Sequence, residues 1–226
     1  MTVLFVIATI LLFLFIDWAS RRVRERKNAP AVQTAAIRPY PIRVPEGIFF
    51  SKSHTWLNLF PSGKLRLGVD DFVGRMVENP EIILLKKTGE HVRRGEPLLT
   101  LKEDEHLLTL RSPIDGEIDS INGELPHHPE LLRDQLFSDG WAYTIVPQRL
   151  SELKSMLLGT ETREWMRVEF GRLRDLFAGT SSDGNVAPAY LQDGGPPMAG
   201  VMRSMDDSVW QEFETRFLAA DDAERI

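Results

Sequence analysis

The sequence predicts a mostly β protein, a sandwich or flattened barrel with short flanking helices, plus one N-terminal transmembrane helix and a C-terminal tail. The prediction depends on three observations. Between Gly47 and Pro147, short strand-like runs alternate with turn signals. Residues 2–19 are almost entirely apolar. Residues 179–205 are rich in Gly, Pro and Ser, and a patterned segment follows them.

Eight strand-like runs lie within this central region. They read GIFFS, HTWLNLF, KLRLGVDD, EIILLKK, EPLLTLK, HLLTLRS, GEIDSING and GWAYTIV. Turn-forming residues separate them, for example PSG at 61–63 and TGE at 88–90. Residues 70–77, DDFVGRMV, predict a short helix capped by Asp70.

The first segment, residues 1–20, predicts a transmembrane helix. Twelve Leu, Ile, Val or Phe residues between Val3 and Ile16 favour insertion by roughly 4–7 kcal/mol as an upper bound. Trp18 is placed as an interfacial anchor, and a basic run follows it. The positive-inside rule then predicts a single-pass protein of the inner (cytoplasmic) membrane with its globular part on the cytoplasmic side. The predicted membrane-interface residues are Trp18, Arg21, Arg22 and Arg24.

Two other interpretations of this segment are less favoured. A cleaved signal peptide carries positive charge before its apolar run, but no Lys or Arg precedes this one, and Asp17 and Trp18 make a poor cleavage site. A buried core helix should show a polar face, and this run has none. Residues 21–46 are basic and then Pro-rich, which predicts an extended linker.

Composition excludes several kinds of chemistry. The chain has no Cys, so disulfides, thiolate metal sites and cysteine nucleophiles are excluded. A formal net charge of −6 argues against general nucleic-acid binding. No Gly-rich phosphate loop and no G-x-S-x-G motif is present, so we expect no enzyme activity. His127 and His128 lie near Glu130 but show no third ligand, so we expect no metal site.

The order of several motifs resembles the glycine cleavage system H protein. FSKSHTWLNL is similar to the opening of that family, and LGVDDF followed by EIILLKKTGEHVRRGEPLLTLK is similar to its next section. LRSPIDGEIDSIN resembles the second strand of its lipoyl hairpin. HPELL with GWAYTIVPQRLSELKSML resembles its closing helix, strand and C-terminal helix, so we expect residues 148–158 to be helical. The resemblance covers residues 47–158 and implies a lipoyl/biotinyl-type β-sandwich.

The lysine that the family lipoylates has no counterpart here. In that family it lies at the hairpin tip, seven residues before the Ser of the Ser-Pro, and this position is occupied by Glu105. Lys102 lies three residues earlier, on the other face of the strand and about 10 Å along it. The resemblance therefore implies a degenerate lipoyl position and no cofactor. Lys102 is a weak alternative acceptor; otherwise it pairs loosely with Glu103, Asp104 or Glu105 on an exposed turn.

Three segments follow the domain. Residues 159–178 predict an additional helix whose apolar stripe comprises Trp165, Val168, Phe170, Leu173, Leu176 and Phe177. Residues 179–205 predict a flexible linker. Residues 206–226 predict an amphipathic helix with Trp210, Phe213 and Phe217 on one face. We expect this helix to dock on another subunit; the alternative is that it folds back on its own domain.

These features predict a non-catalytic, membrane-anchored accessory or scaffold subunit. Its partners would be the lipid bilayer and other subunits of a membrane protein complex, contacted through the transmembrane helix and the C-terminal tail. A respiratory or photosynthetic complex is the host that this architecture favours. Two alternatives remain: a membrane-tethered lipoyl-type carrier that uses Lys102, and a regulator that competes with true H proteins for their partner enzymes.

Overall fold

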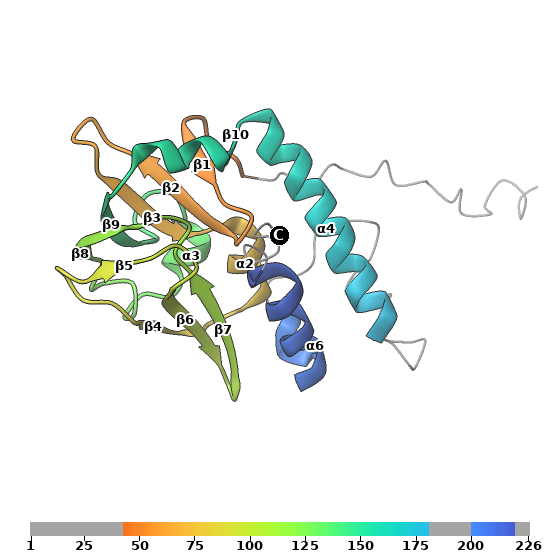
Figure 1. Ribbon diagram of the computed structural model, residues 1–226. Coiled ribbons are helices and arrows are strands. Elements are labelled where there is room, and N and C mark those ends of the chain that lie inside the picture. Colours follow the sequence, from red (N-terminus) through yellow and green to blue (C-terminus); the bar gives the residue numbers. More distant parts are fainter. Residues whose placement is uncertain (1–42, 181–199, 220–226) are drawn as a thin grey trace, which may run out of the picture. The chain divides into compact units, whose positions relative to one another are not determined.

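The computed structural model describes residues 43–180 and 200–219, which belong to one compact unit, and these residues form two antiparallel sheets (Figure 1). The larger sheet has seven strands in the order β10-β1-β2-β3-β9-β8-β5. Its strands, in that order, are Leu157–Leu158, Ile48–Phe50, Thr55–Leu59, Leu65–Val69, Trp141–Pro147, Gly116–Ile121 and His91–Val92. Each of the eight predicted runs contributes a strand to one of the two sheets.

The smaller sheet has three strands in the order β4-β6-β7. Strand β4 is Glu81–Leu84, β6 is Pro97–Glu103 and β7 is His106–Arg111. On one face of β6, Leu99 and Leu101 are fully buried. On the other face, Leu98 and Thr100 are buried as well, and the side chain of Lys102, near the end of the strand, is 42% exposed. Strands β6 and β7 form the hairpin that projects away from the larger sheet in Figure 1.

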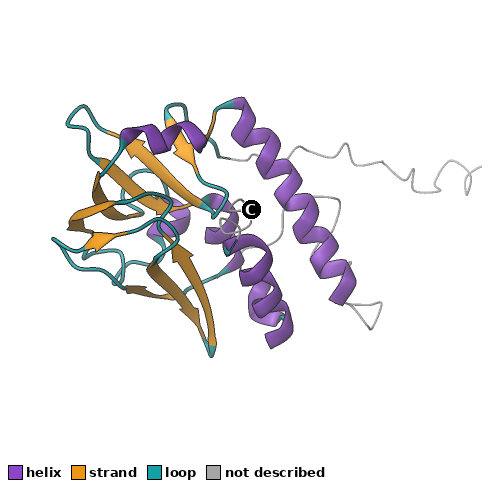
Figure 2. Cartoon of the chain, viewed as in Figure 1, coloured by secondary structure: helices purple, strands orange, loops and turns teal. Residues whose placement is uncertain are grey.

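The helices of the described residues are α2 (Asp71–Met76), α3 (Leu131–Asp134), the 3₁₀ helix η1 (Leu150–Ser155), α4 (Thr160–Thr180), the 3₁₀ helix η3 (Val201–Ser204), α6 (Asp207–Phe213) and the π-helical η4 (Glu214–Leu218). Of these, α2, α4 and α6 lie together on one side of the sheets (Figure 1 and Figure 2). The predicted cap of α2 is confirmed, because the Asp70 side chain accepts from the N–H groups of Phe72 and Val73.

Tyr143 on β9 joins the two sheets. Its hydroxyl donates to the carbonyl oxygen of Leu98 on β6 at 2.7 Å and accepts from the N–H of Lys86, just after β4, at 3.2 Å. The ring is fully buried, and this burial raises the pKa of Tyr143 to about 12. The folded state therefore favours the neutral phenol.

Replacing Tyr143 with phenylalanine is expected to lower the free energy of unfolding by about 1–3 kcal/mol at neutral pH, because the Lys86 N–H loses its acceptor and the Leu98 carbonyl oxygen keeps only the N–H of Leu85. A phenol whose pKa is raised by folding contributes stability that is lost as the pH rises through its folded pKa. Between pH 10 and 12 the wild-type protein should thus lose more stability than Tyr143→Phe. Urea unfolding at both pH values measures this; a parallel decline would contradict it.

Several sequence predictions need correction. Residues 148–158 were expected to be helical, but the helix ends at Ser155, and Leu157 and Leu158 pair with β1 at the edge of the larger sheet. The stripe of α4 includes buried Met166 and Leu173, whereas Val168 is 60% exposed. Residues 200–205, predicted as linker, contain η3, with Val201 and Met202 buried in the core.

Candidate functional site

The β6–β7 hairpin ends in a two-residue turn. Glu103 and His106 are opposed in the ladder, so Asp104 and Glu105 form the apex. Asp104 has a φ of 54°, as the first residue of such a turn requires, and Asp tolerates this conformation better than most residues. Glu105 thus occupies the exposed apex, where the resemblance implied a lysine in a lipoylated relative.

Lys102 lies two residues before the apex turn begins, on the outer face of the hairpin. It is opposite Glu81 in the β4–β6 ladder, and its Nζ lies 3.3 Å from Glu81 Oε2. The expected pairing with Glu103, Asp104 or Glu105 is therefore replaced by a cross-strand pair. Both partners are substantially exposed, so this ion pair contributes at most about 1 kcal/mol.

Glu103 points to the inner side of the hairpin. Its Oε1 accepts hydrogen bonds from the N–H groups of Glu78 (3.0 Å) and Asn79 (3.3 Å), in the loop before β4. The residue is only 7% exposed, and its Oε2 has no hydrogen-bond partner among the described residues. The sequence reasoning missed Glu103 as a site residue, although the alternation that buries Leu101 places Glu103 on the same face.

The chain's own C-terminal segment, η3 to η4, packs against the hairpin (Figure 1). His106 stacks on Trp210, with ring centroids 4.6 Å apart and planes 8° apart, and its Nε2 lies 2.9 Å from Asp207 Oδ1. Glu214 Oε1 accepts from the N–H of Thr109, on the outer edge of β7, at 3.3 Å. The tail thus covers one flank of the hairpin and leaves the apex exposed.

The three predicted docking residues are buried inside this domain. Trp210, Phe213 and Phe217 are at most 3% exposed. Phe213 stacks with Phe72 of α2, and the Arg172 guanidinium of α4 lies 5.0 Å from the Phe217 ring. The structure therefore shows the alternative that the sequence left open, in which the tail folds back. The apolar face of the tail packs against its own domain.

His54, which lies in the FSKSHTWLNL segment, is fully buried in an aromatic environment. Its ring stacks between Phe72 and Trp165, with centroids 4.2 and 5.0 Å away. Its Nδ1 lies 2.8 Å from Asp70 Oδ2, while the other Asp70 oxygen caps α2. His54 adopts a left-handed φ of 61°, which few non-glycine residues do. This group connects the start of β2 with α2 and α4.

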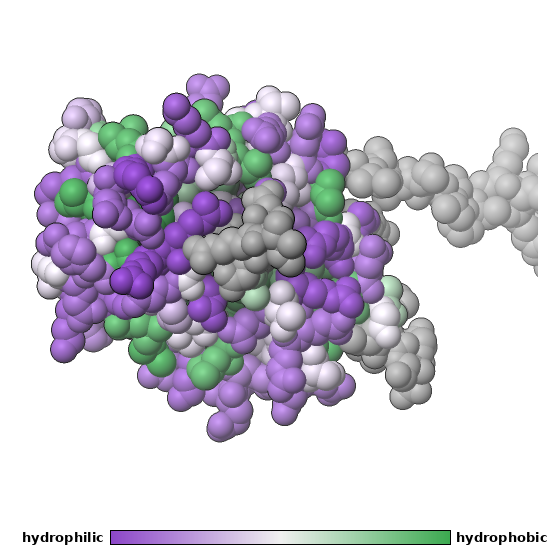
Figure 3. Space-filling model, viewed as in Figure 1, coloured by the Kyte–Doolittle hydropathy of each residue, from purple (hydrophilic) through white to green (hydrophobic). Residues whose placement is uncertain are grey.

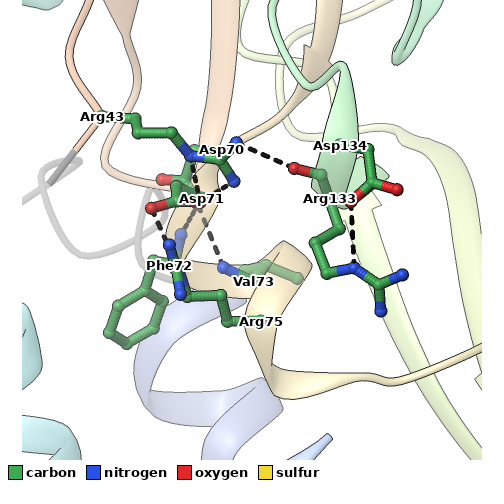
Figure 4. Close-up of polar contacts among 8 residues, drawn as sticks. All are labelled: Arg43, Asp70, Asp71, Phe72, Val73, Arg75, Arg133 and Asp134. Carbon is green, nitrogen blue, oxygen red and sulfur yellow. Dashed lines mark hydrogen bonds and ion pairs between the residues drawn. The ribbon is translucent and has the colours of Figure 1, made fainter. Parts of the chain in front are cut away.

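A second polar cluster surrounds Asp71 (Figure 4). Arg43 Nε donates to Asp71 Oδ1 at 3.0 Å, and Arg75 Nε donates to Asp71 Oδ2 at 3.1 Å. Arg43 also donates to the carbonyl oxygen of Arg133 in α3 at 2.8 Å. Burial raises the pKa of the Asp71 carboxyl, and the hydrogen bond and charge of Arg43 partly offset the increase. The cluster fastens the segment before β1 to α2 and α3.

The remaining sequence-predicted residues do not form a site. His128 Nδ1 lies 3.0 Å from Glu130 Oε1 on an exposed loop. Within the described ranges, no group of three or more His, Cys, Asp or Glu side chains is placed to hold a metal ion. Trp18, Arg21, Arg22 and Arg24 lie outside the described residues. Residues 43–180 and 200–219 contain no helix with the length and apolarity needed to cross a bilayer.

The paired sheets and the projecting hairpin define a lipoyl-type domain. The family model described as "Glycine cleavage H-protein" matches residues 48–169. The chain therefore belongs to the glycine cleavage H-protein family.

Individual relatives are glycine cleavage proteins by name. The glycine cleavage system H protein of Coprothermobacter proteolyticus is 25% identical over 125 residues, covering 55% of this chain and 98% of the relative. The probable glycine cleavage system H protein of Picrophilus torridus is 32% identical over 97 residues, covering 43% of this chain and 77% of the relative. A crystal structure of the H protein from Mycobacterium marinum matches with a TM-score of 0.49 at 19% identity, covering 55% of this chain and 99% of that chain.

Proposed function

We propose that this protein is a non-catalytic, membrane-anchored accessory or scaffold subunit of a membrane protein complex, built on an H-protein domain that has lost its lipoyl site. The observation that carries the proposal is the hairpin apex, where Asp104 and Glu105 stand and no amine is present. Lipoylation forms an amide with a lysine amine, and a carboxylate side chain offers no nitrogen for that bond.

The nearest lysine does not replace the missing one. Lys102 is opposite Leu107 and not at the turn, and it lies three positions before Glu105, an odd offset, so its side chain leaves the strand on the other face. It is also engaged with Glu81 across the sheet. An enzyme that reads the apex of the hairpin would meet Glu105 instead.

Introducing the missing amine is expected to restore modification. We predict that Glu105→Lys, produced together with lipoylating enzymes, gains one lipoyl group, while the wild-type chain gains none. Because residue 105 is exposed at the apex, the substitution should not disturb the fold. Intact mass spectrometry measures the adduct, and Lys102→Arg in the Glu105→Lys background is the control that assigns it to residue 105.

Two results would argue against this interpretation. An unmodified Glu105→Lys chain would show that more than residue 105 separates this hairpin from a substrate of those enzymes. A lipoyl group on Lys102 of the wild-type chain would support the second candidate function, a membrane-tethered lipoyl-type carrier. That candidate has one observation in its favour, the 42% exposure of the Lys102 side chain.

The membrane part of the proposal comes from residues 1–20 and the basic run after them, which support a single-pass anchor in the inner membrane with the domain on the cytoplasmic side. Purification from native membranes in mild detergent tests the subunit role. We expect the full chain to migrate with partner subunits, and an energy-converting complex is the predicted host. A chain that runs alone would refute the subunit role, and a chain released from membranes by an alkaline wash would refute the anchor.

A further inference from the structure

A small pocket opens at the tip of the hairpin, beside the loop before β4 and the start of the C-terminal segment. Its volume is about 280 Å³, and it is lined by Asn79, Glu81, Lys102, Glu103, Asp104 and Arg203. These residues come from three parts of the chain that are far apart in sequence. The volume suits one long side chain, since pockets for drug-sized molecules begin at roughly 300 Å³.

Glu103 gives this pocket an unsatisfied acceptor. Oε1 is fixed by the Glu78 and Asn79 N–H groups, but Oε2 of this 93%-buried residue accepts no hydrogen bond within the described part of the chain. A buried acceptor without a partner costs about 1–3 kcal/mol, and more when it is charged. Oε2 is closed to solvent in this structure, so a donor from the pocket reaches it only when the side chains around it move. A cationic donor at that position would remove the cost.

The surroundings of the pocket are strongly acidic. Two basic side chains, Lys102 and Arg203, are shared among carboxylates: Lys102 pairs with Glu81 at 3.3 Å, and Arg203 lies 3.3 Å from Glu78 and 3.8 Å from Asp104. Since every partner in these pairs is more than 40% exposed, the pairs are weak and can rearrange. The three chain segments that form the pocket and its surroundings carry seven acidic residues: Glu78, Glu81, Glu103, Asp104, Glu105, Asp206 and Asp207.

We propose that this pocket binds a Lys or Arg side chain from a basic segment of a partner protein. The inference rests on the proposed accessory function and names the chemistry of its partner. The carboxylates are not grouped as metal ligands among the described residues, which favours an organic cation. The acidic residues extend well beyond the pocket, which fits a basic segment better than a single small amine. Figure 3 shows a largely hydrophilic face with small, separate hydrophobic patches.

The full chain in micelles of an uncharged detergent provides the test, with a fluorescently labelled hexa-arginine peptide as the probe. Fluorescence anisotropy should show binding to the wild-type chain. Glu103→Gln should weaken it about tenfold, because a charge-assisted hydrogen bond is lost. The amide oxygen of the glutamine still accepts from Glu78 and Asn79, so the thermal midpoint should stay unchanged.

The matched control is Glu161→Gln, which removes the same charge from the exposed first turn of α4. We expect less than a twofold change in affinity. Equal weakening by both substitutions would mean that the peptide responds only to the overall charge of the protein. That result would overturn the proposal that the pocket binds it. Wild-type affinity in Glu103→Gln would overturn it as well. Arg203→Ala, which removes a competing cation from the pocket, should strengthen binding.

Failure of the pocket and failure of the accessory role give different results. If the chain does not bind the peptide but migrates with partner subunits in mild detergent, only the proposed binding at the pocket is refuted. A chain whose peptide binding depends on Glu103 but which runs alone from native membranes refutes the accessory role alone.

Discussion

Replacing Phe213 with alanine is expected to lower the free energy of unfolding by about 3–5 kcal/mol. Phe213 is completely buried, and its ring lies 5.9 Å from the ring of Phe72 and 5.0 Å from that of Phe217. The substitution leaves a cavity between α6, η4 and α2 that rigid neighbours cannot fill. Urea unfolding of the full chain, followed by tryptophan fluorescence, measures the change.

Val168→Ala provides the control for this measurement. It also shortens an apolar side chain in a helix, but Val168 is 60% exposed, so the free energy of unfolding should change by no more than about 0.5 kcal/mol. If Phe213→Ala proved equally mild, the tail would not pack on its own domain in solution. Its aromatic face would then be available for another subunit, as the sequence had led us to expect.

Asp70→Ala is expected to have an effect of similar size, about 3–5 kcal/mol. The carboxylate accepts at Oδ1 from the Phe72 N–H at 3.0 Å, and its Oδ2 lies 2.8 Å from His54 Nδ1. The side chains of Asp70 and His54 are both fully buried. Alanine removes the cap of α2 and leaves the imidazole without its hydrogen-bond partner in an aromatic environment.

Asp70→Asn separates the two contributions. The amide oxygen keeps the cap, while the amide nitrogen faces His54 and removes the acceptor for an Nδ1 proton. We therefore expect the free energy of unfolding of Asp70→Asn to lie between that of the wild-type protein and that of Asp70→Ala. The same unfolding experiment measures it. Equal stability of Asp70→Asn and Asp70→Ala would show that the cap contributes little.

The strands of the domain could be predicted because local pattern and tertiary environment agree. In β3, Leu65 and Leu67 are fully buried and alternate with half-buried Arg66, as the period of two requires. Asp70 precedes an apolar helical turn and acts as its cap for reasons that are local in sequence. Strand β10 was missed because its two leucines are strand only through pairing with β1, more than 100 residues earlier.

The candidate site could be predicted only in outline. Counting from Ser112 located the apex and the absent lysine. The pocket beside it needs Arg203, which no local signal connects with Glu81 or Asp104. The destination of the tail was also beyond sequence reasoning, because an amphipathic helix packs equally well on its own domain or on another protein. Here Phe72 and His106 supply the ring faces that decide between the two.

The hydrogen bond from the Thr109 N–H to Glu214 has a consequence for how the chain completes its fold. Strand β7 is the last strand of its sheet, and an uncovered outer edge offers free N–H and C=O groups to other chains. The residue that covers this edge lies 105 positions later in the chain. During synthesis the hairpin therefore emerges long before its cover. Protection of this edge against strand-to-strand aggregation arrives only after Glu214 has left the ribosome.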